Sequence, residues 1–110
     1  MDIQQIKKSN ITIFVVDGRI DSTTSGILEK ALSIAIEGGS KELLLDFQKM
    51  DYISSAGLRV LLMTAKKTGK LGGKTVLCTL NPNVKEVFDI SGFSAIFNIY
   101  NTQDEAIRSF

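Results

Sequence analysis

Two short apolar runs constrain the fold of this chain more than any other feature. They are KELLLDF at 41–47 and KTVLCTL at 74–80, and neither shows the strict alternation of a strand with one wet face. Continuous runs of this kind are typical of parallel strands, which are covered on both faces. Parallel strands need a long crossover between them, and the segment from 48 to 73 can supply one. We therefore expect a parallel sheet at the centre of the molecule.

The remaining segments alternate between the strand period and the helix period. Strands are expected at 3–7, 11–17 and 95–100, and helices at about 22–37, from 55 onward, after Pro82 and after Thr102. The first helix should bury one apolar face, formed by Ile27, Leu28, Ala31, Leu32 and Ala35. The short polar turn at 8–10 joins two strands as a hairpin does. These patterns predict one α/β domain spanning 1–110, with a mostly parallel sheet of four to five strands, an N-terminal antiparallel hairpin and about four helices.

Composition narrows the class of protein. The net charge is +1 and the basic residues are interspersed with acids, so no direct binding of nucleic acid is expected. The lysines at 66, 67, 70 and 74 are interpreted as solvating the end of a helix and a loop. No apolar run reaches the roughly 20 residues of a membrane span, and no secretory signal is visible, which favours a soluble cytoplasmic domain. The single cysteine, Cys78, lies in an apolar run and reads as a small buried hydrophobic residue.

The chain contains no histidine. That absence removes the Ser-His and Cys-His nucleophile pairs and every histidine-ligated metal site. Asp46 and Asp51 flank one strand end, but no second acidic pair completes a metal cage, and no phosphate-binding loop is present. We predict neither metal nor cofactor. An enzyme could still use Asp, Glu or Lys, but the missing histidine makes this class less expected.

The segment MDYISSAGLRVLL, at 50–62, carries the strongest functional signal. Ser54 and Ser55 stand at the start of a helix whose core stripe is Leu58, Leu61, Leu62 and Ala65. Either hydroxyl can cap that helix. A serine at an exposed helix start is also accessible to a kinase, and the free amides of the first turn would stabilise its phosphate. Phosphorylation there would change binding without unfolding the domain.

The opposite face of the same helix is unusually apolar. It presents Ala56, Val60, Met63 and Lys67. Either the protein itself covers this face, or the face is a docking patch beside the serines. Gly57, in the first turn, is explained by close backbone approach of a neighbour or ligand, or by local crowding.

Three segments resemble the STAS domains of bacterial anti-sigma factor antagonists, in the family's order and spacing. They are GRIDSTTSGILEKAL, LLLDFQKMDYISSAGLRVLL and NPNVKEVFDISGFSAIFNIYNTQDEAI, which together cover most of the chain. The resemblance implies a STAS-type domain that is not an enzyme. Dephosphorylated members bind an anti-sigma factor that is also a serine kinase, and a PP2C-type phosphatase reverses the kinase reaction.

The resemblance also implies site residues. The family pattern D-S-[ST]-G-L, phosphorylated on its first hydroxyl residue, aligns here so that the phosphate acceptor is Ser55, with Ser54 as a rival. Asp21 matches the family's acidic residue at the start of the first helix. This sequence departs from the pattern at Ser54, where the family has Asp, and at Ala56.

We therefore predict an anti-sigma factor antagonist switched by phosphorylation of Ser55. Its docking surface is predicted to consist of Asp21, Ser54, Ala56, Gly57, Val60 and Met63. The domain is expected to be a monomer or weak dimer. The alternative is a constitutive STAS scaffold, or a regulatory subunit of a transporter or stress-signalling complex.

Overall fold

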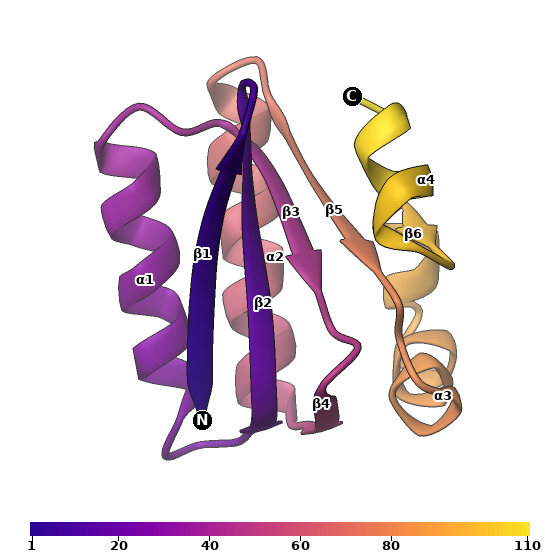
Figure 1. Ribbon diagram of the computed structural model, residues 1–110. Coiled ribbons are helices and arrows are strands. Elements are labelled where there is room, and N and C mark those ends of the chain that lie inside the picture. Colours follow the sequence, from indigo (N-terminus) through magenta and orange to yellow (C-terminus); the bar gives the residue numbers. More distant parts are fainter.

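The computed structural model describes all 110 residues and contains six strands and four α-helices (Figure 1). The elements, in chain order, are β1 (Asp2–Lys8), β2 (Ile11–Ile20), α1 (Ser25–Glu37), β3 (Glu42–Asp46), β4 (Met50–Ile53), α2 (Ser55–Lys70), β5 (Lys74–Cys78), α3 (Pro82–Ser91), a short 3₁₀ helix (Phe93–Ala95), β6 (Ile99–Tyr100) and α4 (Gln103–Arg108). No helix has both the length and the apolar character needed to cross a membrane.

The sheet has the strand order β1-β2-β3-β5-β6, and only the β1–β2 hairpin is antiparallel. β2 is long enough to have two parallel partners. Its first half pairs with β3, from Ile11 opposite Glu42 to Val15 opposite Asp46. Its last residues pair with β4, so that Ile20 lies opposite Ile53. The predicted α/β class, parallel core and N-terminal hairpin are confirmed.

Alternate residues of the central strands enter two separate cores. Leu43 and Leu45 of β3 belong to the larger core, on the face covered by α1 and α2, whereas Leu44 belongs to the smaller core on the other face. This is the period-2 geometry of a strand, and it explains why an uninterrupted apolar run was required. The two apolar runs correspond to the two strands buried on both faces.

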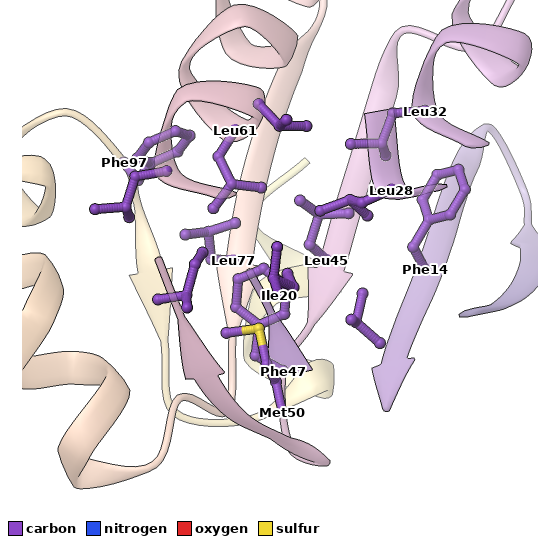
Figure 2. Close-up of a cluster of buried hydrophobic side chains, with 14 of the residues drawn as sticks. Phe14, Ile20, Leu28, Leu32, Leu45, Phe47, Met50, Leu61, Leu77 and Phe97 are labelled. Carbon is purple, nitrogen blue, oxygen red and sulfur yellow. The ribbon is translucent and has the colours of Figure 1, made fainter. Parts of the chain in front are cut away.

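The larger core contains 18 buried residues from the sheet and from α1, α2 and α3. Figure 2 shows Phe14 beside Leu28 and Leu32 of α1, and Phe47 and Met50 beside Ile20. At about 25 cal/mol per Å² of buried apolar area, a leucine such as Leu61 contributes roughly 1.5–3 kcal/mol. Burial of these side chains fixes α1 and α2 against the sheet, and with them the first turn of each helix.

The smaller core is closed by α4. Ala106 of α4 packs on Ile13, Val76 and Cys78 of the sheet. The Gln103 amide donates to the nearly buried carboxylate of Asp46, with 2.9 Å between Nε2 and Oδ2. Asp46 therefore serves a structural role at the end of β3.

Three details of the fold differ from the sequence prediction. β4 was not predicted as a strand, so the sheet has six strands where four to five were expected. The predicted strand at 95–100 is reduced to Ile99–Tyr100 because a 3₁₀ helix occupies Phe93–Ala95. Ile27 was assigned to the core face of α1, and this was wrong, because its side chain is 53% exposed. Leu28, Leu32 and Ala35 form the buried face as expected.

The glycines of α2 give a test of how the helix is seated. A Cβ on Gly57 would lie 2.6 Å from Cγ2 of Ile20 and 2.8 Å from Cγ1 of Ile53, whereas a Cβ on Gly69 would meet nothing within 4 Å. Overpacking against stiff β-branched side chains costs about 1–3 kcal/mol, partly offset by the ~1 kcal/mol that alanine gains over glycine in a helix. Gly57→Ala should therefore lower the free energy of unfolding in urea by up to about 2 kcal/mol.

Gly69→Ala is the matched control and should raise the free energy of unfolding by up to about 1 kcal/mol. Equal changes in the two variants would contradict the close approach of Ile20 and Ile53 to the first turn of α2.

Cys78 gives a second test. Burial raises the pKa of its thiol to about 11, against an ordinary value of 9.0. Because the thiolate is the reactive form, only about one thiol in a thousand is ionised at pH 8. Iodoacetamide should leave the native protein unmodified at that pH and alkylate it fully in guanidinium chloride, as measured by intact mass. Native alkylation at the unfolded rate would show that Cys78 is accessible.

Candidate functional site

The candidate site lies where β2 and β4 end side by side. Ile20 and Ile53 are paired neighbours in the sheet, and the Ser54 amide donates to the Ile20 carbonyl at 2.8 Å. Asp21 follows Ile20 on one strand, and Ser54 and then Ser55 follow Ile53 on the other. The carboxyl ends of parallel strands meet at one edge of a sheet, so the starts of α1 and α2 are brought together. Two segments more than thirty residues apart in the sequence thus form one surface.

A carboxylate lies in the turn just before α1. Oδ1 of Asp21 accepts hydrogen bonds from the Thr23 amide at 2.9 Å, the Thr23 hydroxyl at 2.7 Å and the Thr24 amide at 3.2 Å. Oδ2 pairs with Nε of Arg19 at 3.1 Å. The hydrogen bonds from Thr23, helped by Arg19, hold the pKa of Asp21 well below its usual range. Asp21 is therefore a fixed negative charge beside the start of α2.

The start of α2 is open. Ser54 is its N-cap, and its hydroxyl accepts from the Gly57 amide at a long 3.3 Å. The amides of Ser55 and Ala56 have no partner within the chain. No acidic residue lies in the first turn of α2. This turn therefore retains unpaired donors that an anion can accept from.

The two serines differ in exposure. Ser55 is exposed at the first helical position, whereas Ser54 is half-buried and engaged as the cap. The sequence did not show which serine caps the helix and which is accessible. In the structure Ser54 is the cap and Ser55 carries the accessible hydroxyl.

The other predicted docking residues fall into two groups. Ala56 is half-buried and Met63 is 41% exposed. Gly57 and Val60 are buried, and Val60 belongs to the larger core with only 7% of its surface exposed. The two alternatives for the apolar face of α2 therefore apply to different residues. The protein itself covers Val60, whereas Met63 is exposed.

Sequence reasoning missed Arg19 and Tyr52, which lie next to Asp21. They are paired neighbours on β2 and β4, and the Arg19 guanidinium stands 4.6 Å from the centre of the Tyr52 ring. Tyr52 is 43% exposed. Only the recognition of β4 as a strand could have placed them, because their contact follows from its register with β2. Tyrosine and arginine are also enriched where proteins bind one another.

The site is a surface rather than a cavity. The two pockets of the molecule lie elsewhere, around Asn10 and Glu42 at the opposite end of the sheet. No group of three or more acidic or cysteine side chains is close enough to hold a metal ion. An exposed hydroxyl, open amides and a neighbouring carboxylate suit contact with a macromolecule and a modification that adds charge.

Solved structures of low sequence identity share this fold. An anti-sigma factor antagonist, SpoIIAA in its unphosphorylated form, superposes with a TM-score of 0.84 at 22% identity, covering 96% of this chain and 93% of that chain. SpoIIAA of Bacillus in the phosphorylated form gives a TM-score of 0.76 at 21% identity, over 98% of each chain.

Several relatives align with this chain over almost its whole length. BtrV of Bordetella bronchiseptica, a candidate anti-sigma factor antagonist, is 39% identical over 110 residues, covering 100% of this chain and 95% of BtrV. The anti-sigma F factor antagonist of Paenibacillus polymyxa is 27% identical, over 97% of this chain and 92% of its own. The anti-sigma-B factor antagonist of Listeria monocytogenes is 29% identical, over 96% and 91%.

The family model of the STAS domain matches residues 2–106, nearly the whole chain. This match, the end-to-end relatives and the shared fold confirm the resemblance carried by the three sequence segments. The chain belongs to the STAS domain family, and its relatives are anti-sigma factor antagonists.

Proposed function

We infer that this protein is an anti-sigma factor antagonist switched by phosphorylation of Ser55. In the dephosphorylated state it binds an anti-sigma factor that is also a serine kinase, and this frees the sigma factor. Phosphate on Ser55 releases the partner, and a PP2C-type phosphatase restores binding. The observation that carries this proposal is the exposed Ser55 hydroxyl on the open first turn of α2, in a chain whose relatives are antagonists of this class.

The open amides explain why the fold would tolerate the modification. A phosphoserine brings a charge of about −1.5 to −2 and three acceptor oxygens. At Ser55 those oxygens would find the unpaired amides and the positive end of α2, an interaction of about 0.3–1 kcal/mol on an exposed surface. The folded domain is therefore expected to keep its stability after phosphorylation.

Asp21 explains why the same phosphate would change binding. Its carboxylate is held ionised at the neighbouring helix start by Thr23 and Arg19. The added phosphate would double or triple the negative charge of this small surface and would occupy the space that a docked partner needs. A partner placed against the α1 and α2 starts would lose both shape and charge complementarity.

Ser54 supports the choice of Ser55 as acceptor. Its hydroxyl already accepts from the Gly57 amide, as the aspartate of the family pattern can at an N-cap. Serine and aspartate are both good N-caps, so this departure from the pattern retains the cap and removes a charge. The departure bears on recognition by the kinase rather than on the geometry of α2.

The docking surface around Ser55 would consist of the exposed and half-buried side chains. These are Asp21, Ser54, Ala56 and Met63, joined by Arg19 and Tyr52. Gly57 and Val60 would support this surface without forming part of it. Both are buried and hold the first turns of α2 against the sheet.

Phosphorylation with a cognate anti-sigma kinase and ATP tests the proposal directly. The chain should gain one phosphate, located at Ser55 by mass spectrometry. Ser55→Ala should gain none and should still bind the kinase. Ser54→Ala should still be phosphorylated, at a cost in stability of about 1 kcal/mol for the lost cap. Phosphorylation that survives Ser55→Ala and disappears in Ser54→Ala would transfer the switch to Ser54.

Binding is tested with a permanent charge. Ser55→Asp should abolish or weaken partner binding at least a hundredfold in calorimetry, while its melting temperature stays within a few degrees of the parent because the acid lies at a helix start. Ser9→Asp is the matched control, placed on the exposed hairpin turn at the opposite end of the sheet, and should bind normally. A Ser55→Asp protein that binds its partner unchanged would instead support a constitutive STAS scaffold.

A further inference from the structure

Six lysines gather at the end of the sheet opposite Ser55. They are Lys7 and Lys8 at the end of β1, Lys41 before β3, and Lys66, Lys67 and Lys70 in the last turns of α2. All six are exposed, and none takes part in a salt bridge. Figure 1 shows the β1–β2 turn, the α1–β3 connection and the α2–β5 turn at the same end of the molecule. We call this surface the basic end.

The pairing of the strands assembles the basic end. Lys8 lies opposite Ile11, Ile11 opposite Glu42, and Glu42 opposite Lys74, so these four residues form one row across the sheet. The Lys74 amide also donates to the carbonyl of Lys41 at 3.0 Å, which joins the α2–β5 turn to the start of β3. Lysines that are scattered along the sequence are therefore neighbours in space.

Few opposite charges accompany these lysines. Glu37 and Glu42 are the acidic residues on the same helix and strand ends, and Glu42 is half-buried. The ammonium of Lys74 is already occupied, because it donates to the Ser109 carbonyl and lies over the ring of Phe110. The net charge of the whole chain is only +1. Six free ammonium groups on one surface therefore mean that positive charge is concentrated at the basic end, and most acidic residues lie elsewhere.

An exposed leucine stands among these lysines. Leu71 ends α2, is 50% exposed and belongs to neither hydrophobic core. Lys70 precedes it, and Gly72 and Gly73 follow it in a tight turn. An exposed apolar side chain at the same end as several ammonium groups matches the boundary of a bilayer, where lysines reach headgroup phosphates and the apolar side chain enters the acyl region.

We propose that the basic end docks on the surface of an anionic lipid bilayer, with Leu71 inserted and the six lysines on headgroup phosphates. The chemistry favours lipid over nucleic acid in two respects. The six cations are lysines, which lack the arginine fork that contacts base edges and phosphates in pairs, and Arg108 at the end of α4 is the one arginine at this end. Contact with a polyanion would also leave Leu71 without an apolar environment.

The proposal is independent of the switch at Ser55. The starts of α1 and α2 lie at the other end of the sheet, so a membrane-bound molecule would keep its docking surface free. Membrane binding is therefore expected to be the same for the parent and for Ser55→Asp.

Sedimentation with vesicles tests the proposal. The full chain should co-sediment with phosphatidylcholine vesicles that contain phosphatidylglycerol, and not with phosphatidylcholine alone. Binding should fall steeply as salt rises from about 0.05 M to about 0.5 M, because screening shortens the reach of the lysines. The triple variant Lys66→Gln, Lys67→Gln, Lys70→Gln should bind about a hundredfold more weakly, at roughly fivefold per lysine.

Two matched controls separate the basic end from overall charge and overall apolarity. The triple variant Lys30→Gln, Lys49→Gln, Arg59→Gln changes three exposed cations elsewhere and shifts the net charge equally, from +1 to −2, but should bind vesicles like the parent. Leu71→Ser should weaken binding several-fold, while Ile90→Ser, at an 80% exposed position of α3, should not.

Several results would overturn the proposal. These are a failure to bind anionic vesicles at low salt, an equal loss in the two triple variants, and indifference of vesicle binding to Leu71→Ser. Tighter binding to duplex DNA than to vesicles at the same salt, lost in the basic-end triple variant, would reassign the surface to nucleic acid.

Discussion

The functional surface depends on the parallel pairing of the last residues of β2 with β4. The Ile20 carbonyl accepts from the Ser54 amide, and this single hydrogen bond marks the point at which both strands leave the sheet. After each strand the chain continues into a helix, α1 after β2 and α2 after β4, and both helices pack on the same face of the sheet. Without this pairing, Asp21 and Ser55 would have no fixed relation. The close fit of Gly57 against Ile20 and Ile53 then fixes how near α2 approaches the strands.

The two helix starts treat the same physical problem differently. An α-helix leaves amides without partners at its N-terminus, and something must accept from them. Just before α1 the Asp21 carboxylate accepts from the amides of Thr23 and Thr24 and from the Thr23 hydroxyl, while the Asp21 carbonyl accepts from the Ser25 amide, the first of the helix. At α2 it supplies only one long bond from Ser54 and leaves the next two donors to solvent. The turn before α1 therefore already holds a carboxylate, whereas the start of α2 holds none and leaves room for an added anion.

Much of this arrangement could be read from the sequence, because its signals are local. Apolar runs predicted the central strands, and hydroxyl residues predicted the start of α2. The helices predicted after Pro82 and Thr102 are also present, with Asn81 and Thr102 as their N-caps. β4 escaped prediction because its four residues expose Asp51 and Tyr52, and its identity as a strand depends on pairing with β2. Val60 and Ile27 were misplaced because burial around a helix depends on how far its neighbours wrap it, which the helical period does not specify. The gathering of lysines escaped for a related reason: it is a product of register between distant strands.

The length of β2 has a consequence for anything held at both ends of the molecule. The strand runs from Ile11, in the row of the basic end, to Ile20, beside the candidate site, with one shift of register between Gly18 and Arg19. Nine steps of about 3.3 Å make this roughly 30 Å, close to the 31 Å long dimension of the domain. A strand hydrogen-bonded on both sides and buried for most of its length cannot stretch or fold up. β2 therefore sets a constant distance between the two ends of the domain. A partner bound at Ser55 would be held at that distance from any surface to which the basic end is bound.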